Sequence, residues 1–401
     1  MAARGGAVVR LSPDQSAAAD AIASWLRTPA KKSFKLGGYA GTGKTTTIQE
    51  LINKGALGPD VACCAPTGKA AQVLSRRLGG IKATTIHQLI YQPRIRGSER
   101  LAALKAQYDR TRDQALLPKI AAEEKRVGEL TFVSKDWVNI SPGTVLVVDE
   151  ASMVTPQMAV DLSRTSAKII YVGDPGQLPP VKASQFFANP DFTLTQVHRQ
   201  ALQSPIIRAS LAIREDGPMP ENCPEFMRVK KGATGHEEYN SADVILCGMN
   251  LTRMKFNRFM RKLNNRATML PCEGDVIIVT KNNYAFGLMN GQLATAIGTA
   301  DVCPHTGDHS LLIRADDGDV VTIPIDPAQF LAHYTEGKHL DECDNSIVCA
   351  TYGYAITVHK AQGSEWPSVI LADDAGGKFP RKPWLYTAVT RAKEHLRWIV
   401  K

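Results

Sequence analysis

Residues 38–45 read Gly-Tyr-Ala-Gly-Thr-Gly-Lys-Thr and could bind phosphate groups. The string fits the pattern G-x-x-x-x-G-K-[ST], in which glycines let backbone N–H groups curl around phosphate oxygens. Lys44 would reach the β- and γ-phosphates of a nucleotide, and the Thr45 hydroxyl would ligate Mg²⁺. Residues 34–36 predict a short strand before the loop, and residues 45–51 predict a helix whose N-terminus favours anions. The alternative is an ordinary glycine-rich turn. The nucleotide-binding set comprises Gly38, Gly41, Thr42, Gly43, Lys44, Thr45 and Thr46.

Two carboxylates follow a second buried strand. Residues 144–150 read Thr-Val-Leu-Val-Val-Asp-Glu. Beside a phosphate loop, Asp149 could hold Mg²⁺ through water, and Glu150 could orient and deprotonate the water that attacks a γ-phosphate. Two acids at a strand end can also simply cap a loop.

A third strand, residues 168–172, leads into Gly-Asp-Pro-Gly-Gln-Leu-Pro-Pro at residues 173–180. Glycine and proline hold the polar Asp174 and Gln177 in a stiff turn. Such a turn suits a sensor, because it would transmit a small shift at the γ-phosphate. An ordinary proline-rich turn is the equally open alternative.

The composition is that of a globular protein with more than one domain. The chain has 401 residues, of which 44% are hydrophobic and 22% charged. Its net charge of +9 suits a polyanionic partner. No apolar run approaches the length of a membrane span. The apolar core within the first ten residues is too short for a signal peptide. Eight cysteines without C-x-x-C pairs predict reduced thiols and a cytoplasmic setting.

Short Val- and Ile-rich runs alternate with helical segments, which predicts an α/β fold with parallel sheets covered on both faces. Residues 94–140 interrupt the first sheet with charged helices, and this pattern predicts a solvated arm. A second α/β unit is expected to begin near Asp191. Short alternating strands interrupt it from about residue 275, which predicts a small β-barrel with a hairpin turn at Asp317-Gly318. The strands expected in the second sheet are residues 244–247, 347–350, 369–371 and 396–400.

Taken together, these segments resemble the ordered motifs of superfamily 1 DNA helicases, closest to the RecD/Dda-like branch that moves 5′→3′. The phosphate loop, the acid pair and the turn at residues 173–180 resemble three of the motifs. The similarity runs from about Leu11 to the C-terminus. The other similar segments are Ala-Pro-Thr-Gly-Lys-Ala-Ala at 65–71, Thr-Thr-Ile-His at 84–87, Leu-Thr-Gln-Val-His-Arg-Gln at 194–200, Ala-Ile-Thr-Val-His-Lys-Ala-Gln-Gly-Ser-Glu at 355–365 and Leu-Tyr-Thr-Ala-Val-Thr-Arg-Ala-Lys at 385–393.

The resemblance implies two RecA-like P-loop domains with ATP and Mg²⁺ in the cleft between them. Residues 1–93 and 141–190 would form the first domain and 191–272 and 346–401 the second. Residues 94–140 would be an inserted, mainly helical arm or pin subdomain, and 273–345 an inserted SH3-like β-barrel.

The resemblance also assigns roles to residues around the nucleotide. Arg199 and Arg391 of the second domain would stabilise transition-state charge as arginine fingers, with surface ion pairs as the alternative. Gln177 would report on the γ-phosphate, and Gln15 would read adenine. Gln15 has a competing role, because Ser12-Pro13-Asp14-Gln15 also predicts a helix-starting capping box. The remaining nucleotide contacts implied are Gly363 and Glu365.

Single-stranded DNA is expected to cross both domains, held by hydroxyls and backbone N–H groups that bind phosphates without reading sequence. A β-hairpin pin is expected in the first insert, but helices dominate there, and Tyr91 is only a candidate for the pin. The DNA-contact residues implied by the resemblance are Pro66, Thr67, Thr85, His87, Asn290, Thr357, His359 and Lys360.

The resemblance therefore implies a monomeric, cytoplasmic, ATP-dependent DNA helicase that moves 5′→3′ on single strands and opens duplex junctions. Replication or repair proteins are its expected partners. A 3′→5′ helicase of the same superfamily is one alternative, disfavoured because its large helical inserts are missing. An ATP-gated protein that grips single strands without unwinding is another. A module that serves only inside a nuclease complex is a third.

Overall fold

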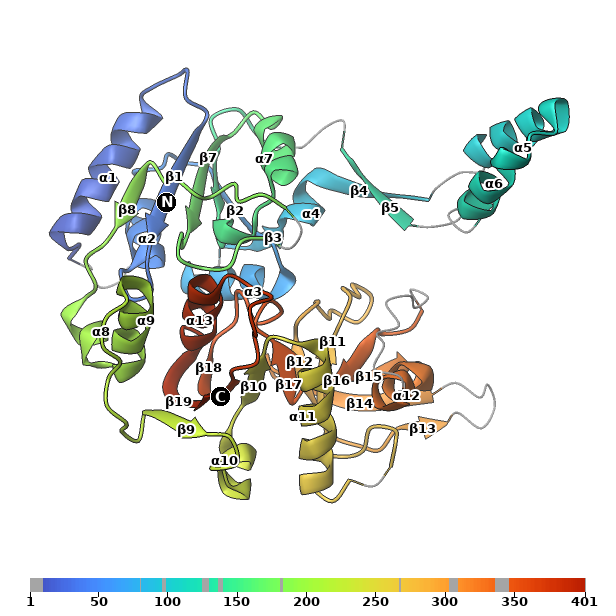
Figure 1. Cartoon of the computed structure of the whole chain (residues 1–401). Helices are drawn as coiled ribbons and strands as arrows, with labels where there is room; N and C mark the ends of the chain where they lie inside the picture. Colours follow the sequence, from blue (N-terminus) through green and yellow to red (C-terminus); the bar gives the residue numbers. More distant parts are fainter. Residues whose placement is uncertain are drawn as a thin grey trace.

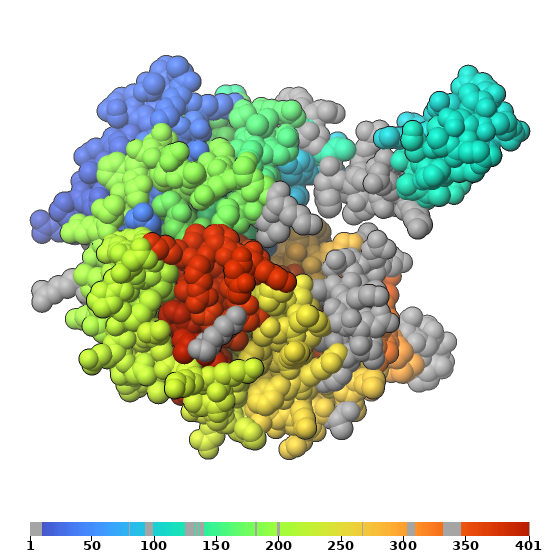
Figure 2. Space-filling model, viewed as in Figure 1, coloured from blue at the N-terminus to red at the C-terminus, as the bar shows by residue number. Residues whose placement is uncertain are grey.

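The computed structural model describes residues 10–79, 81–95, 99–124, 130–135, 140–180, 183–266, 268–302, 309–335 and 346–400. Two α/β units lie against each other, and a slender arm extends from the first (Figure 1). The space-filling view shows the arm helices, in cyan, standing clear of the body (Figure 2). No helix in the described part of the chain is long and apolar enough to cross a membrane.

The first unit is built on one parallel sheet of strand order β3-β2-β6-β7-β1-β8. All four residues of β6 are buried, because helices cover both faces of the sheet. The strands are β1 (Ser33–Gly38), β2 (Val61–Ala65), β3 (Ala83–Thr85), β6 (Val145–Val148), β7 (Lys168–Gly173) and β8 (Phe192–Leu194). The helices are α1 (Pro13–Leu26), α2 (Lys44–Asn53), α3 (Gly68–Arg77), α4 (Ile86–Ile90), η2 (Ala151–Met153) and α7 (Pro156–Ser163).

The arm is an antiparallel hairpin, β4 (Tyr91–Ile95) with β5 (Leu130–Ser134), that carries a helical tip. The tip comprises α5 (Glu99–Thr111), η1 (Gln114–Leu116) and α6 (Leu117–Glu124). No residue of α5 is buried, as its charged sequence predicts for a solvated arm. Tyr91, the pin candidate, lies at the base of this hairpin, where its hydroxyl donates to Asp161 at 2.7 Å.

The second unit repeats the parallel arrangement, with strand order β17-β10-β18-β19-β9. Its strands are β9 (Phe226–Lys230), β10 (Val244–Cys247), β17 (Ala355–Thr357), β18 (Trp366–Ala372) and β19 (Ala392–Val400). Its helices are α8 (Arg199–Gln203), α9 (Pro205–Glu215), α10 (His236–Ser241), α11 (Asn250–Leu263) and α13 (Arg381–Val389). The predicted α/β class with two parallel sheets is therefore confirmed.

An antiparallel sheet of order β13-β14-β12-β11-β16, with β15 beside β14, interrupts the second unit. The expected hairpin joins β14 to β15, and Gly318 in its turn has φ of +98°. Closure of this sheet into an SH3-like barrel stays a prediction. The elements are β11 (Val276–Val279), β12 (Leu293–Ala296), β13 (Asp301–Val302), β14 (His309–Ala315), β15 (Val320–Ile325), α12 (Pro327–Thr335) and β16 (Ala350–Tyr352).

Three expectations are wrong. The second unit was expected to begin near Asp191, but β8 pairs with β1, so the first sheet continues past that residue. The three residues of β8 are too few to show a strand period in the sequence. Residues 347–350 were expected to form a strand of the second parallel sheet. The strand there is β16 (Ala350–Tyr352), and it pairs with β11 in the antiparallel sheet instead. Reduced thiols were expected throughout, but Cys349 is disulfide-bonded. The absence of a C-x-x-C pair in the sequence does not exclude such a bond. The free cysteines among the described residues are Cys63, Cys64, Cys223, Cys247 and Cys272.

A buried ion pair ties the second unit to its insert. The Arg261 guanidinium, on α11, donates to Asp275 Oδ1 at 3.0 Å, and neither side chain is exposed to solvent. We expect Arg261→Met to lower the free energy of unfolding by about 1–3 kcal/mol, because it removes one of the two guanidinium partners of a buried carboxylate, the other being Arg266 at 3.1 Å. Denaturant unfolding measures this change. Lys382→Ala breaks an exposed pair with Asp216 and is the control; it should cost under about 1 kcal/mol. Equal effects would contradict the account.

Candidate active site between the two α/β units

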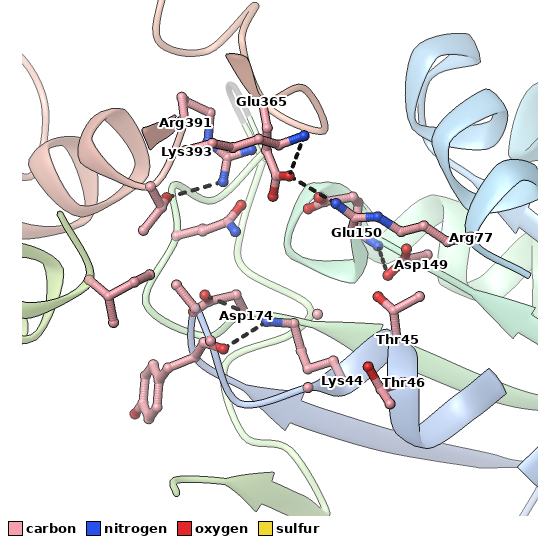
Figure 3. A pocket seen from close by; sticks show the side chains of 18 of the residues that line it. Lys44, Thr45, Thr46, Arg77, Asp149, Glu150, Asp174, Glu365, Arg391 and Lys393 are labelled. Atoms are coloured by element: carbon pink, nitrogen blue, oxygen red, sulfur yellow. Dashed lines mark hydrogen bonds and ion pairs between the residues drawn. The ribbon is translucent and has the colours of Figure 1, made fainter. Parts of the chain in front are cut away.

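A cleft of about 510 Å³ lies between the two units and is lined by residues of both. The first unit contributes the loop after β1, the acids after β6 and the turn after β7. The second unit contributes residues 390–393 at the start of β19, Glu365 before β18, and Ser204 and Ile207 at the start of α9. Figure 3 shows the charged side chains of both walls pointing into this space. The expected catalytic residues Lys44, Asp149, Glu150, Gln177 and Arg391 all line it.

The phosphate loop takes the tight path that its glycines predict. Gly41 and Gly43 have φ of +77° and +79°, a backbone region that residues with a Cβ rarely adopt. A Cβ on Gly43 would also lie 2.8 Å from His198 Nε2, so glycine is needed for space as well as for backbone shape. Inside the loop, the Thr42 hydroxyl donates to the Tyr39 carbonyl at 2.8 Å.

Lys44, the first residue of α2, folds back over the loop. Its ammonium donates to the carbonyls of Gly38 at 2.7 Å and Tyr39 at 3.1 Å, and it lies 3.8 Å from Asp174 Oδ2. Thr45 and Thr46 follow it along the cleft wall. The carbonyl oxygens that now accept from this ammonium carry only partial charge. A nucleotide phosphate would replace them as its partner, because a phosphate oxygen is a stronger acceptor.

The two acids after β6 lie deeper in the cleft. Glu150 has φ of +52°, a strained conformation for a residue with a side chain and one that recurs at functional sites. Burial raises the pKa of Glu150 to about 7, and the negative charge of Asp149 adds to this shift. The positive charges of Arg391 and Lys44 oppose it. A carboxyl with its pKa near neutrality is matched to accepting a proton from water.

The donor set fits Mg²⁺ in the way that nucleotide sites use this ion. The Asp149 carboxylate accepts a hydrogen bond from the Glu150 amide at 2.9 Å. Burial raises the Asp149 pKa despite the opposing charges of Lys44 and Arg77, so a further cation would be favourable there. Thr45 and Asp149 both line the cleft, and Mg²⁺ typically takes one or two protein oxygens with phosphate and water. The described residues contain no cluster of three or more His, Cys, Asp or Glu for a protein-only metal site.

Arg391 comes from the second unit, two residues after the end of α13. Its guanidinium donates to the carbonyls of Thr387 and Ser364, each at 3.0 Å, and to the Thr390 hydroxyl at 3.1 Å. These bonds fix the side chain, which is 3% exposed, at the cleft wall where its charge acts on Glu150. Arg199 begins α8, and its side chain lies outside the described part of the structure.

Glu365 forms the centre of a charge cluster that spans the cleft. Its carboxylate lies 2.8 Å from Arg77 of α3 and 3.7 Å from Lys393 of β19 (Figure 3). Burial alone would raise the pKa of Glu365, but Arg391, Arg77 and Lys393 outweigh it and lower the pKa. Arg77 and Lys393 were missed from the sequence. Lys393 ends the segment 385–393 that resembles a helicase motif, whereas nothing in the sequence marks Arg77.

The glutamines and the remaining glycine occupy distinct places. Gln177 lines the cleft, and its buried Oε1 has no hydrogen-bond partner among the described residues. Gln15 fills the predicted capping box with Ser12, and its amide also donates to the Gly43 carbonyl at 3.2 Å. One side chain thus starts α1 and touches the phosphate loop. Gly363 lies outside the cleft lining, against α3.

The expected DNA contacts lie at the starts of helices and turns in both units. Thr67, Thr85 and Thr357 accept hydrogen bonds from the amides three residues ahead, so each hydroxyl already has a capping partner. Pro66 precedes the first of these caps, and Lys360 donates its amide to the last.

The two histidines each lie beside an aromatic ring. Burial lowers the pKa of His87 and of His359, which favours neutral imidazoles. Their rings lie 5.2 Å from Tyr91 and 4.8 Å from Phe379, centroid to centroid. Neutral rings of this kind suit hydrogen bonding or stacking better than charge pairing with phosphates.

Contacts between elements bring several DNA candidates together. A Cβ on Gly68 would lie 2.6 Å from Met289 Cβ, so the start of α3 touches the loop that carries Asn290. A Cβ on Gly363 would lie 3.6 Å from the Thr67 hydroxyl. Candidates from the first unit, the second unit and the insert therefore meet around the start of α3.

A phosphate loop, an acid pair one strand away across β7 and a buried arginine from a second parallel α/β unit define a P-loop nucleoside triphosphatase with two RecA-like domains. An AAA domain profile matches residues 3–228, and the profile of the UvrD-like helicase C-terminal domain matches residues 352–399. The chain therefore belongs to the AAA-domain family, and it is similar to superfamily 1 helicases of the RecD type.

Relatives and solved structures agree with this placement. The ATP-dependent RecD2 DNA helicase of Deinococcus radiodurans is 28% identical over 96% of this chain and 48% of its own length. The RecBCD subunit RecD of Mycolicibacterium smegmatis is 26% identical over 98% of this chain and 73% of its own. The chain thus spans about half of the first relative. A Bacteroides Pif1 bound to single-stranded DNA shares the fold, with a TM-score of 0.56, 19% identity and coverage of 98% and 92%.

Lys44→Ala should weaken nucleotide binding and stop hydrolysis, because it removes the ammonium that would hold the β- and γ-phosphates. Binding of a fluorescent ATP analogue and release of phosphate measure the two effects. Lys54→Ala is the control, since Lys54 lies at the other end of the same helix, exposed and 3.2 Å from Glu50. Turnover that survives Lys44→Ala would remove the phosphate-loop assignment.

Proposed function

We propose that this chain is an ATP-dependent DNA helicase that translocates 5′→3′ on single-stranded DNA and opens duplex DNA at junctions. The observation that carries the proposal is the position of Arg391. It comes from the second unit, yet it faces Glu150 of the first across the cleft that holds Lys44. A site assembled from two bodies links nucleotide chemistry to their relative movement.

The hydrolysis step follows from the chain's own groups. Lys44 and the loop amides would hold the phosphates, and Glu150 would take the proton from the attacking water. Mg²⁺ held by Thr45 and Asp149 would neutralise phosphate charge. Arg391, and Arg199 if its side chain reaches the cleft, would stabilise the charge that develops on the transferred phosphoryl group.

Translocation then needs only that the two units bind the DNA strand tightly in turn. Closure on ATP and opening after hydrolysis would move the Thr357–Lys360 contacts relative to those of Thr67 and Thr85. Separating one base-pair step costs about 1.4 kcal/mol in stacking, which one ATP can supply. Both walls of the cleft belong to one chain, so we expect a monomer to suffice. The net charge of +9 agrees with a polyanionic track.

The second candidate function is an ATP-gated protein that grips single strands without hydrolysis or unwinding. Glu150, half-buried in the cleft with its pKa raised to about 7, favours turnover over such a switch. Replication or repair proteins are proposed as partners because the RecD relative is named as a subunit of RecBCD.

Glu150→Gln should retain ATP binding and lose at least about a hundredfold in kcat, the scale of general-base catalysis. Phosphate release with and without single-stranded DNA measures kcat, and binding of labelled ATP measures affinity. Glu215→Gln is the control, because Glu215 is an exposed carboxylate at the end of α9, outside the cleft. Near-normal turnover in Glu150→Gln would place the base elsewhere.

Duplexes that carry a single-stranded tail on one side only test the direction of movement. We expect unwinding with ATP and Mg²⁺ from a 5′ tail and none above background from a 3′ tail. The opposite preference would favour the 3′→5′ alternative. ATP-dependent binding without strand separation on either substrate would favour the gated-grip alternative.

A further inference from the structure

The turn after β7 belongs to the first unit by sequence but is held by the second. Leu178 is 1% exposed and packs within the core that contains Ile206, Phe226 and Trp384 of the second unit. Its amide donates to the Thr387 hydroxyl at 2.8 Å. Its carbonyl accepts from Gln362 Nε2 at 2.9 Å. Leu178 must therefore follow the second unit whenever the two units move, while Gly173, the last residue of β7, stays with the first sheet.

A tyrosine hydroxyl connects this turn to the phosphate loop. Tyr386, on α13 of the second unit, accepts a hydrogen bond from the Ala40 amide at 2.8 Å and donates to Asp174 Oδ2 at 2.7 Å. The Ala40 amide can only donate, so the proton of the hydroxyl goes to the carboxylate. The same carboxylate oxygen lies 3.8 Å from the Lys44 ammonium.

These contacts form one chain of groups with the nucleotide site at one end. Ala40 belongs to the phosphate loop, and Asp174 provides the negative charge beside Lys44. Gln362, which holds Leu178, follows His359 and Lys360 by three and two residues. Movement of α13 thus reaches the loop through Tyr386, and movement of the turn reaches the expected DNA contacts through Gln362.

We propose that the Tyr386 hydroxyl is a positioning group that couples the phosphate loop to the second unit. It holds the Ala40 amide and the Asp174 carboxylate in a fixed relation. A phosphate that draws Lys44 away from Gly38 and Tyr39 leaves Asp174 without its cation. The hydroxyl passes that change to α13 and, through Leu178, to the DNA side. This inference rests on the proposed function, since it concerns the same nucleotide site.

Tyr386→Phe tests the proposal, because it removes the hydroxyl and keeps the buried ring. Tyr354→Phe is a matched control. Its hydroxyl also donates to a buried carboxylate, Asp275 at 2.9 Å, and accepts from a nitrogen, Arg266 Nη1 at 2.7 Å, but both partners lie away from the cleft. Thr387→Val, which removes the hydroxyl that accepts from Leu178, is a second test variant with no change at the phosphate loop.

We expect Tyr386→Phe to lower the DNA-stimulated kcat about tenfold, the scale of one hydrogen bond to a charged group, with the KM for ATP within about twofold of wild type. The Kd for single-stranded DNA is also measured with and without AMP-PNP and Mg²⁺. In wild type the ratio of these two Kd values should be at least about fivefold, as for coupled sites. It should fall towards one in Tyr386→Phe and Thr387→Val and stay unchanged in Tyr354→Phe.

The outcomes separate this inference from the function beneath it. A wild-type chain that hydrolyses no ATP with single-stranded DNA present contradicts the proposed function, and the inference falls with it. A wild-type chain with DNA-stimulated hydrolysis, beside a Tyr386→Phe variant that matches Tyr354→Phe in kcat and in the Kd ratio, contradicts the inference alone. An equal loss in both tyrosine variants would indicate a structural role only.

Discussion

The nucleotide site of this chain has walls that belong to two bodies. Lys44 and Glu150 are fixed by one parallel sheet, and Arg391 by another, so neither unit can surround a triphosphate alone. The charged side chains make the cleft sensitive to whether a nucleotide is bound. Glu365 lies among Arg77, Lys393 and Arg391, and Asp174 lies 3.8 Å from Lys44. A polyphosphate entering this space must redistribute those pairs, and that requirement connects chemistry to movement.

The turn at residues 173–180 gives that movement a route. It leaves the sheet of the first unit but is buried in the core of the second through Leu178. A stiff segment anchored at both ends transmits displacement because its glycines and prolines leave it few conformations to absorb one. The start of α3 offers a second junction, where Gly363 and Met289 approach Thr67 and Gly68. The two units are thus joined at two separate places, one beside the nucleotide cleft and one among the expected DNA contacts.

Sequence reasoning succeeded where residue type alone dictates local structure. The phosphate loop, the capping box at Ser12 and the buried strand at Val145–Val148 each follow from short-range physics, and all three were predicted. It failed where the partner lies far along the chain. β8 is too short to show a period, β16 takes its sheet from β11, and Arg77 and Tyr386 gain their roles only through tertiary contact.

The central claim is that ATP closes one cleft between two bodies. The distance between a donor dye at Ser24 on α1 and an acceptor dye at Glu237 on α10, both exposed and on different units, measures it directly. With single-stranded DNA present, the account predicts a shorter distance with AMP-PNP and Mg²⁺ than with ADP, and no such difference in an Arg391→Ala chain. A distance that is the same with either nucleotide in the wild-type chain would contradict it.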